Sequence, residues 1–595
     1  MRRFVITCDV LVRSYTTQVN TREIVCGAQT TMTRQRRTEA RKAMLKRGLG
    51  LVVAFTLGAA TGFAQSNDDL VNDGRKPQNV TTQSMGYHRR SYSPLKQVNT
   101  STVKRLVPVW NSSLMNDLGE LAAPVVYDGV MYVINGKWTF AIDVDTGRQI
   151  WRTAVRLEAG ARGPAINRGA PAIYNGKLFR VTMDNHVLAL DMKTGKEIWN
   201  QKFADTKEGY YATSAPMVAN GVLISGMAGG ESTTRGFLDG WNPDTGEKLW
   251  RRYTIPAPGE PGSETWPRDD AWKYGGGPTW RTGSYDPELD LVYWGVGNAE
   301  PYDPRPRGAL DSLYTSSVLA IRPKTGEIAC FYQFTPNDVY DVDGTDEFAL
   351  ADLRVGGRVR KVMIQANKNG FLYVLDRTDC SLIAAHPYVK VNWATHVDLK
   401  TGRPVHTDLY EKFLAGEEVA VYPSRGTNAV PIAFDPQRQL VFASTWDIPR
   451  VQKLAEPRAA VIGGNSSGVT SRVPDVTPGE VLGHFVAINP VTGEKKWEVP
   501  LVDFPGSAGM LATAGGLVFS GKLTGEVVAL DADTGKTVWS FQTGSSVNAT
   551  AVTYMHKGRQ YVSIASGRGG ILATRYTSDK VPTGGSMWTF ALLPQ

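Results

Sequence analysis

Short apolar strands alternate with polar turns along most of the chain, and many turns share one phrase, Ala-x-Asp-x-x-Thr-Gly-x-x-x-Trp. Three copies are intact and four are weaker, at Ala141–Trp151, Ala189–Trp199, Ala529–Trp539, Gly240–Trp250, Ala320–Cys330, Ala487–Trp497 and Val374–Leu382. In the clear copies an apolar strand enters a turn, where glycine reaches positive φ without steric cost, and a second strand follows. The pattern predicts strand–turn–strand units repeated along the chain.

Repeats of this spacing indicate one structural unit stacked many times. A unit of about four strands, ended by a tryptophan that packs against its neighbour, describes a propeller blade. The strands PIAFDP and QLVFAST within Pro431–Thr445 predict one further blade that lacks the phrase. We therefore expect an all-β fold, an eight-bladed β-propeller with tryptophan docking, and seven blades as the alternative.

The first 64 residues differ from the rest and predict a leader. Basic residues crowd positions 34–47 and precede the apolar run Gly48–Ala64, which is short and glycine-rich for a membrane span. Residues 1–64 are therefore interpreted as a leader with a signal peptide, and 65–595 as one propeller domain without a membrane span. The alternative is an uncleaved anchor. Translation from Met32 or Met44 would leave residues 1–31 outside the protein.

The net charge of +9 is a property of this leader. Residues 1–64 hold eleven basic and three acidic residues, which leaves 55 basic and 54 acidic residues for the remainder. A basic surface is what nucleic-acid binding requires, so the near-neutral remainder argues against that function.

Export leaves only Cys330 and Cys380 in the chain. Each lies near the end of a repeat phrase, and the sequence allows either one disulfide or two isolated thiols. The chain has no Cys-x-x-Cys-His motif, so no covalent haem is expected.

Between Trp250 and Trp497 the phrase becomes sparse, and the segments Ala257–Gly277 and Pro301–Asp311 interrupt it. Long loops on a rigid scaffold are where ligands bind.

Four polar residues in this interrupted half follow predicted strands: Glu231, Asn298, Asp341 and Asp343. Carboxylate and amide oxygens that converge on a propeller axis would suit a hard cation. Alternatively, these residues are ordinary turn formers.

These segments together resemble the pyrroloquinoline quinone (PQQ)-dependent alcohol dehydrogenases, a family of eight-bladed periplasmic quinoproteins, over roughly residues 68–590. By this resemblance, the segment Gly275–Asn298 supplies Trp280 as the floor under the quinone and Asn298 as a metal ligand. GGESTTRG supplies Glu231 to the metal, and TPNDVYDVDG supplies Asp341 as the catalytic base and a metal ligand. The other implied cofactor contacts are Arg168 in INRG, Thr213 in YATSAP, Lys368 in NKNGFLYVLDRTD and Asn428 in RGTN.

The chain departs from the family pattern in two places. Arg162-Gly163 stands where members usually have two adjacent cysteines, so the cover over the second face of the quinone is different. A tryptophan typical of methanol-specific members is replaced near Ser507 and again near Ile571, which indicates a wider substrate pocket.

The resemblance implies oxidation of an alcohol by hydride transfer to PQQ, with a metal as Lewis acid and Asp341 as general base. Electrons would pass to a separate soluble cytochrome c in the periplasm, because the chain lacks its own haem. The oligomeric state stays open, with a homodimer as one expectation. A dehydrogenase for sugars or bulky secondary alcohols and a non-catalytic scaffold of the outer-membrane assembly type are the alternatives.

The metal is expected to be a lanthanide(III) ion, with Ca²⁺ as the alternative. Asp343 lies two residues after Asp341, so in extended backbone both side chains would face the same way. An aspartate here resembles the lanthanide-dependent members, and a trivalent ion gains from the additional carboxylate. Alternatively, Asp343 only caps the turn at Gly344.

Overall fold

The computed structural model describes residues 65–71, 74–115, 120–161, 166–456, 461, 463–465, 467–569 and 581–594. These residues belong to one compact unit, Thr61–Gln595. The predicted leader, its alternative start sites and the Arg162-Gly163 pair lie outside the described residues.

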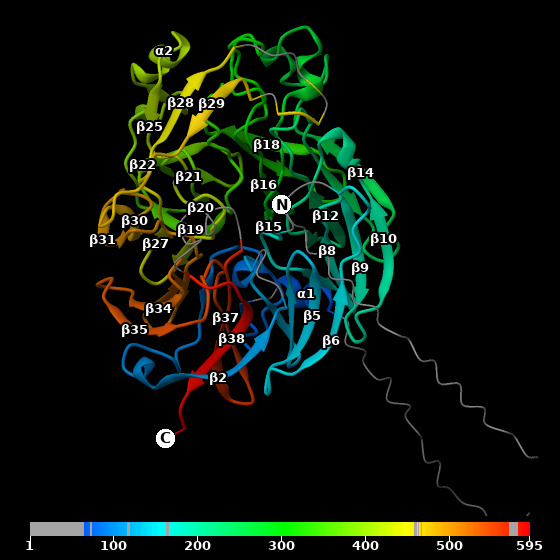
Figure 1. Ribbon diagram of the computed structural model, residues 1–595, viewed down its shortest axis with the longest axis vertical. Helices are drawn as coiled ribbons and strands as arrows, with labels where there is room; N and C mark the ends of the chain where they lie inside the picture. Colours follow the sequence, from blue (N-terminus) through cyan, green and yellow to red (C-terminus); the bar gives the residue numbers. More distant parts are fainter. Residues whose placement is uncertain are drawn as a thin grey trace, which may run out of the picture. The chain divides into compact units, whose positions relative to one another are not determined.

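Strands dominate the described residues, which confirms the prediction of an all-β fold (Figure 1). The described α-helices are α1 (Asn67–Val71) and α2 (Leu409–Leu414), and both are short. None of the helices in the described part of the chain has the length and apolar composition needed to cross a membrane.

Eight sheets of four or five strands follow one another around a common centre (Figure 1). The first four are β3–β6 (Val125–Tyr127, Val130–Ile134, Trp138–Asp143, Gln149–Ala154), β7–β10 (Ala172–Tyr174, Lys177–Val181, His186–Asp191, Glu197–Lys202), β11–β14 (Met217–Ala219, Val222–Gly226, Phe237–Trp241, Lys248–Tyr253) and β15–β18 (Ser284–Asp286, Leu291–Gly295, Ser317–Ile321, Ile328–Gln333). The next three are β19–β22 (Ala349–Val355, Arg358–Ala366, Phe371–Asp376, Leu382–Pro387), β26, β27, β30 and β31 (Ala433–Asp435, Leu440–Ser444, Val481–Ile488, Lys495–Val502), and β32–β35 (Leu511–Thr513, Leu517–Gly521, Glu526–Asp531, Thr537–Gln542) with β1 (Tyr92–Ser93) at its edge.

The eighth sheet joins distant parts of the chain. Its strands β36, β37 and β38 (Val552–His556, Arg559–Gly567, Gly585–Leu592) pair with the early strand β2 (Leu106–Ser113). The prediction that Pro431–Thr445 hides a separate blade is wrong. Its strands β26 and β27 pair with β30 and β31 and so belong to the sheet of the Ala487–Trp497 phrase. The eighth sheet contains no copy of the repeat phrase, because its strand β2 comes from the beginning of the propeller and pairs with β38 at the end. The sequence therefore could not reveal this sheet.

Neighbouring sheets are joined by the tryptophans of the phrase. The Trp151 indole donates a hydrogen bond to the Met192 carbonyl (3.0 Å) and lies against Gly195 in the next turn. A Cβ on Gly195 would collide with that ring, so only glycine allows the contact. The same indole-to-carbonyl bond is made by Trp110 to Val144, Trp199 to Pro243, Trp250 to Pro323, Trp497 to Ala532 and Trp539 to Leu106.

Two sheet interfaces use other side chains in place of the tryptophan: Cys330 stands at the tryptophan position itself, and His386 stands two residues beyond it. Cys330 forms a disulfide with Cys380, which occupies the glycine position of the next turn and shares its positive φ of 64°. The Cα atoms are 5.8 Å apart. At the next interface His386 Nε2 contacts the Val491 carbonyl (2.9 Å) and packs on Gly493. The disulfide alternative is therefore the correct one, and a covalent bond replaces the tryptophan contact.

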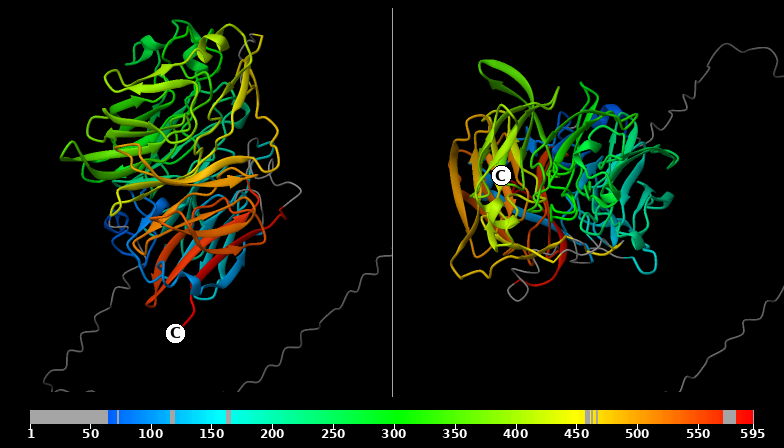
Figure 2. Two further views of the ribbon diagram at one scale, coloured as in Figure 1. Left: turned by 90° about the vertical axis from the view of Figure 1, so that its left-hand side faces the viewer. Right: turned by 90° about the horizontal axis from the view of Figure 1, so that it is seen from above.

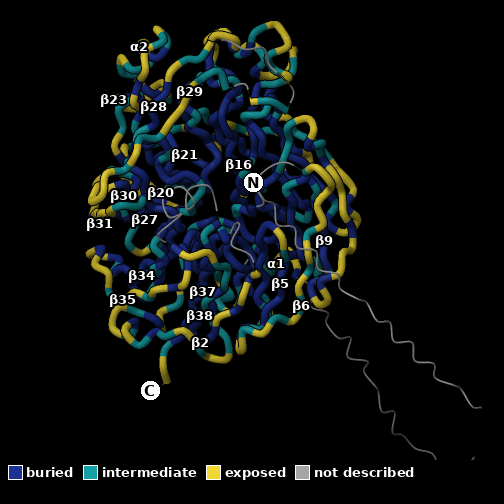
Figure 3. The backbone as a smooth tube through the Cα atoms, viewed as in Figure 1, coloured by how far each residue is buried: buried dark blue, intermediate teal, exposed yellow. Residues whose placement is uncertain are grey.

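The side views show the sheets stacked face to face (Figure 2). Inner strands such as β12 and β16 are buried throughout, whereas outer strands such as β10 alternate or are exposed (Figure 3). Additional elements lie in the sparse half of the repeat, namely the hairpin β23–β24 (Ala394–Asp398, Arg403–His406), and a sheet of β25, β28 and β29 (Val419–Val421, Arg450–Leu454, Val469–Arg472).

We predict that Gly195→Ala lowers the free energy of unfolding more than Gly558→Ala does. Both glycines have positive φ (70° and 77°), but no atom lies within 4 Å of a Cβ built on Gly558. The control should cost about 1 kcal/mol for backbone strain. Gly195→Ala should cost about 1–3 kcal/mol more, because it overpacks the Trp151 ring. Equal midpoints of denaturant unfolding for the two variants would contradict the docking role of Gly195.

Candidate functional site

A cavity of about 420 Å³ lies where loops from several sheets meet. Its lining includes eight of the nine predicted site residues: Arg168, Thr213, Glu231, Trp280, Asp341, Asp343, Lys368 and Asn428. The ninth, Asn298, is buried beside the cavity, and its backbone N–H donates to Oδ1 of Asp343 (2.9 Å). The structure thus brings together side chains that are far apart in the sequence.

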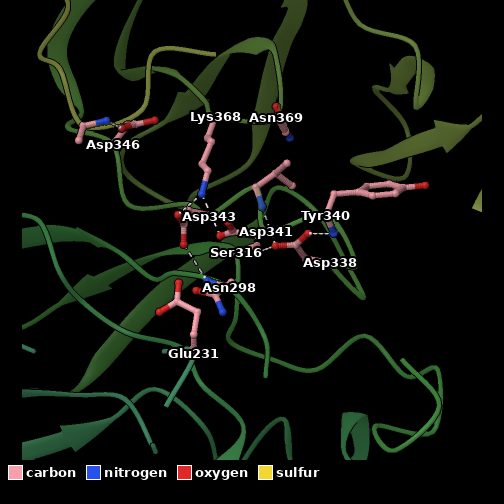
Figure 4. A network of polar contacts seen from close by, with 12 residues as sticks. Glu231, Asn298, Ser316, Asp338, Tyr340, Asp341, Asp343, Asp346, Lys368 and Asn369 are labelled. Carbon is pink, nitrogen blue, oxygen red and sulfur yellow. Dashed lines mark hydrogen bonds and ion pairs between the residues drawn. The ribbon is translucent and has the colours of Figure 1, made fainter. Parts of the chain in front are cut away.

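Lys368 binds both aspartates of the predicted cation site. Its Nζ lies 2.9 Å from Oδ1 of Asp341 and 2.7 Å from Oδ2 of Asp343. Figure 4 shows Lys368 reaching these carboxylates from one side, with Glu231 and Asn298 on the other. All of these side chains face one small volume, so their charges act on each other with little water between them.

Arg450, which begins β28, was not predicted and forms a second ion pair with Asp341. Its Nη1 lies 2.6 Å from Oδ2 of Asp341 and also donates to the Tyr340 carbonyl. Burial raises the pKa of Asp341, but the charges of Lys368 and Arg450 outweigh burial and hold the pKa at about 2. Asp341 is therefore ionised at neutral pH. No local motif marks Arg450, because it belongs to the additional sheet and not to a repeat.

The loop that carries both aspartates is wound around Asp338, which was also not predicted. The Asp338 carboxylate accepts hydrogen bonds from the backbone N–H groups of Tyr340 (2.9 Å) and Val342 (3.0 Å) and from the Ser316 hydroxyl (3.0 Å). The expectation of extended backbone is wrong, since φ is 57° at Asp341 and 24° at Asp343. Both side chains nevertheless meet Lys368, because this loop turns them toward it.

Two glycines allow the walls of the site to approach. A Cβ on Gly230 would lie 2.9 Å from Oδ1 of Asn298, and a Cβ on Gly297 would lie 2.7 Å from Oδ1 of Asp343. Glu231 follows Gly230 directly, so its loop packs closely on the loop of Asn298. Burial and then the negative charge of Asp341 raise the pKa of Glu231. A cation placed among these carboxylates would relieve that repulsion.

The donor set fits a hard cation in its chemistry, because Glu231, Asp341 and Asp343 offer carboxylate oxygens and Asn298 an amide oxygen. Among the residues that the structure describes, no three His, Cys, Asp or Glu side chains are grouped so that they could hold a metal ion as they stand. The ammonium of Lys368 supplies the positive charge between the two aspartates instead. A cation bound here would therefore share these carboxylates with Lys368 or replace its ammonium.

The floor of the cavity fits a flat anionic ligand. The Arg168 guanidinium carbon lies 5.0 Å from the centre of the Trp280 ring, and the Thr213 hydroxyl donates to the Trp280 carbonyl (3.2 Å). Burial and then the charge of Arg281 lower the pKa of Arg168 to about 10. Arg168 forms no ion pair with a described residue. A partly buried arginine that has no carboxylate partner among the described residues is suited to bind a carboxylate of a ligand that stacks on Trp280.

A second cavity of about 80 Å³ shares Arg168, Arg425 and Asn428 with the first. Ser507 also lines it, and the buried Ser507 hydroxyl has no hydrogen-bond partner among the described residues. The predicted replacement of a tryptophan near Ser507 therefore coincides with open space next to the main cavity. The second predicted replacement, near Ile571, lies outside the described residues.

Comparisons with known proteins find relatives that match most of the chain. A family model for PQQ proteins, "Glucose/ethanol/alcohol dehydrogenase, beta-propeller domain", matches residues 83–392 and 482–562. The quinohemoprotein alcohol dehydrogenase ADH IIB of Pseudomonas putida is 39% identical over 513 residues, which are 82% of this chain and 73% of that protein. The quinoprotein alcohol dehydrogenase PedH of the same species is 37% identical over 587 residues, or 91% of this chain and 96% of that protein.

Among solved structures, a europium-containing methanol dehydrogenase superposes with a TM-score of 0.82 at 30% identity, covering 88% of this chain and 100% of that one. Together with the family model, this match confirms the β-propeller fold that the repeats predict.

We predict that Lys368→Met destabilises the metal-free protein by about 3–5 kcal/mol, because it leaves the buried Asp343 carboxylate without its counter-ion and Asp341 with Arg450 alone. The control is Lys361→Met, which removes a partly exposed pair with Glu288 and should cost about 0–1 kcal/mol. Thermal unfolding measures both effects.

The effect of Lys368→Met should also depend on pH. The folded-state pKa of Asp341 is about 2, below its ordinary value of 3.8, so its ion pairs stabilise the fold above about pH 4. This stabilisation is lost as the pH falls from 4 toward 2, and the difference between Lys368→Met and wild type should shrink over that range. A difference that stayed constant would contradict the ion-pair interpretation.

Proposed function

Since the chain belongs to the PQQ-dependent alcohol dehydrogenases, we propose that it oxidises an alcohol to an aldehyde or ketone in the cavity around Asp341. The observation that carries this proposal is the convergence of Trp280, Lys368 and Asp341 on one cavity. An aromatic floor, a buried ammonium and an ionised carboxylate are what a flat quinone, its oxygens and a hydroxyl proton need.

Bound PQQ supplies the hydride acceptor, and a metal ion beside it supplies Lewis-acid polarisation. Trp280 stacks on the ring system, and Arg168 binds one of its carboxylates with a planar guanidinium. The Lys368 ammonium, which is paired with Asp341 and Asp343 in this structure, would also bind the quinone oxygens, while Thr213 and Asn428 complete the polar wall. These residues bind and orient the cofactor and exclude water from the reacting atoms.

Asp341 acts as the general base and takes the proton of the alcohol hydroxyl on a carboxylate oxygen. Lys368 and Arg450 hold this carboxylate ionised and fix its direction through ion pairs on both oxygens. The proton then lies next to the polar wall of the cavity, from which it can pass to solvent.

The proposed metal ligands are Glu231, Asn298, Asp341 and Asp343, and the proposed metal is a lanthanide(III) ion, with Ca²⁺ as the alternative. Three carboxylates beside a carboxylate-bearing cofactor favour the higher ionic charge. The similarity to a europium-containing methanol dehydrogenase supports this choice. The position of Asp343, in contact with Lys368 and close to Gly297, places its carboxylate within the same charged cluster.

We further propose that the eight sheets are the blades of one closed propeller formed by residues 65–595. The series of docking contacts runs from Trp110 in β2 through the other sheets to Trp539, whose indole donates to the Leu106 carbonyl in β2. The last contact therefore returns to the sheet in which the series began, as a closed ring requires.

The partner expected for reoxidation is a soluble cytochrome c in the periplasm, reached after cleavage of the 1–64 leader. A homodimer is the proposed assembly. The alcohol itself is a small molecule, and the open space beside Ser507 supports a pocket wider than one for methanol. Sugars and bulky secondary alcohols are the alternative substrates, and an activity screen over alcohols of graded bulk separates the two.

We predict that Asp341→Asn lowers the turnover of the PQQ- and metal-loaded enzyme by about 10²–10⁴-fold, because the amide cannot accept the hydroxyl proton. Dye-linked alcohol oxidation measures the loss, and quinone content shows whether the cofactor is still bound. The control Asp311→Asn, on an exposed pair with Arg403, should keep wild-type turnover. Turnover near wild type in Asp341→Asn would refute its assignment as the base.

A second prediction concerns the metal. La³⁺ should activate metal-free, PQQ-loaded enzyme far better than Ca²⁺, and Asp343→Ala should lose the La³⁺ response before it loses Ca²⁺ binding. The reason is that the trivalent ion gains more from the Asp343 carboxylate. Activity and isothermal titration with each ion test this, with Asp352→Ala as an exposed control. Full activation by Ca²⁺ with no gain from La³⁺ would contradict the lanthanide assignment.

A further inference from the structure

Tyr302 brings a hydroxyl to Glu231, one of the proposed metal ligands. Its Oη donates to Oε1 of Glu231 (3.2 Å), and the side chain is 6% exposed. A tyrosine hydroxyl carries its proton at neutral pH and so can serve as the donor. This hydrogen bond fixes the direction of one Glu231 oxygen.

The segment that carries Tyr302 is held by Arg307, a fully buried arginine without an ion-pair partner among the described residues. On one side, Nε donates to the Pro301 carbonyl (2.7 Å) and Nη2 to the Tyr302 carbonyl (3.4 Å). The guanidinium therefore hydrogen-bonds to the backbone carbonyls that precede and follow the Tyr302 side chain. Burial lowers the pKa of Arg307 to about 10, which still leaves it charged at neutral pH.

Arg307 also hydrogen-bonds to the loop that carries Asp341 and Asp343. Nη2 donates to the Asp338 carbonyl (2.8 Å), and Nη1 donates to Oδ1 of Asn337 (3.0 Å) and to the Ser312 hydroxyl (2.8 Å). The Asp338 carboxylate in turn holds the backbone on either side of Asp341 (Figure 4). A continuous series of hydrogen bonds thus connects Glu231 to the loop of Asp341 and Asp343.

We infer that Tyr302 is a positioning residue for Glu231, and that Arg307 couples it to the aspartate loop, so that the two walls of the cation site keep a fixed separation. This inference rests on the proposed metal site. Residues that hydrogen-bond to ligating carboxylates orient them, and their loss typically weakens metal binding by about 10–100-fold. Neither residue needs to touch the ion to have this effect.

The test is Tyr302→Phe, which removes the hydroxyl and keeps the ring. La³⁺ is titrated by calorimetry into the metal-free, PQQ-loaded full chain. The dissociation constant should rise by about 10–100-fold. At saturating La³⁺, turnover should return to within about twofold of wild type, because the base and the quinone contacts are intact. A role in packing alone would change the unfolding midpoint but not this affinity.

Tyr314→Phe is the matched control. Tyr314 lies close to Tyr302 in the chain, is 8% exposed, and donates its hydroxyl to the Pro261 carbonyl (3.0 Å), which is not part of the carboxylate cluster. It should lower the unfolding midpoint as much as Tyr302→Phe and leave La³⁺ affinity unchanged. Affinities within twofold of wild type for both variants would overturn the positioning role.

Arg307→Lys tests the coupling, because lysine keeps the charge but cannot span both loops. Arg307→Lys should raise the La³⁺ dissociation constant. In the double variant with Tyr302→Phe, the fold-increase of the dissociation constant should be smaller than the product of the two single-variant increases. Independent, multiplicative losses would overturn the coupling. Arg305→Lys is the control, because Arg305 forms a partly exposed ion pair with Asp303, and it should leave the La³⁺ affinity unchanged.

The outcomes also separate this inference from the function on which it rests. If the wild-type protein binds La³⁺ and the Tyr302→Phe variant binds it with the same affinity, only the positioning role is contradicted. A wild-type protein that binds neither La³⁺ nor Ca²⁺ overturns the cation site and the positioning role together.

Discussion

The contact on which the rest of the structure depends is the docking of an outer-strand side chain onto the turn of the next sheet. A tryptophan such as Trp151 makes this contact at most interfaces, with an indole hydrogen bond and a ring packed on glycine. Glu231, Asn298 and Lys368 belong to loops of different sheets, so the distances between them are set by how the sheets stack. The chemistry at the centre therefore depends on contacts at the periphery.

Charge is the second constraint. Three carboxylates face one cavity, and their repulsion is balanced by Lys368 and by Arg450. Arg450 comes from the additional sheet of β25, β28 and β29 and not from a repeat unit. The interruptions of the repeat thus contribute a charged side chain directly to the site.

The sequence predicted the fold class from its repeated turn, and it named the nine candidate site residues partly from their place after predicted strands and partly from the family resemblance. The repeated turn marks most docking contacts, and Glu231, Asn298, Asp341 and Asp343 follow recognisable strands. Contacts between distant segments left no such mark. The pairing of β2 with β38 and the ion pair of Arg450 with Asp341 became visible only in three dimensions. The side chains of Asp341 and Asp343 were expected to face the same way because of an extended backbone. They do both contact Lys368, but the backbone there is a loop around Asp338 with positive φ at both aspartates.

The position of the Lys368 ammonium between two aspartates has a consequence for the order of assembly. A metal-binding cluster of bare carboxylates would resist folding until its ion arrived, because like charges would be forced together. Here the polypeptide carries its own temporary counter-ion, so folding can be completed first. At the proposed metal site, an incoming ion would then share with Lys368, or take from it, the task of balancing the charge of the two aspartates.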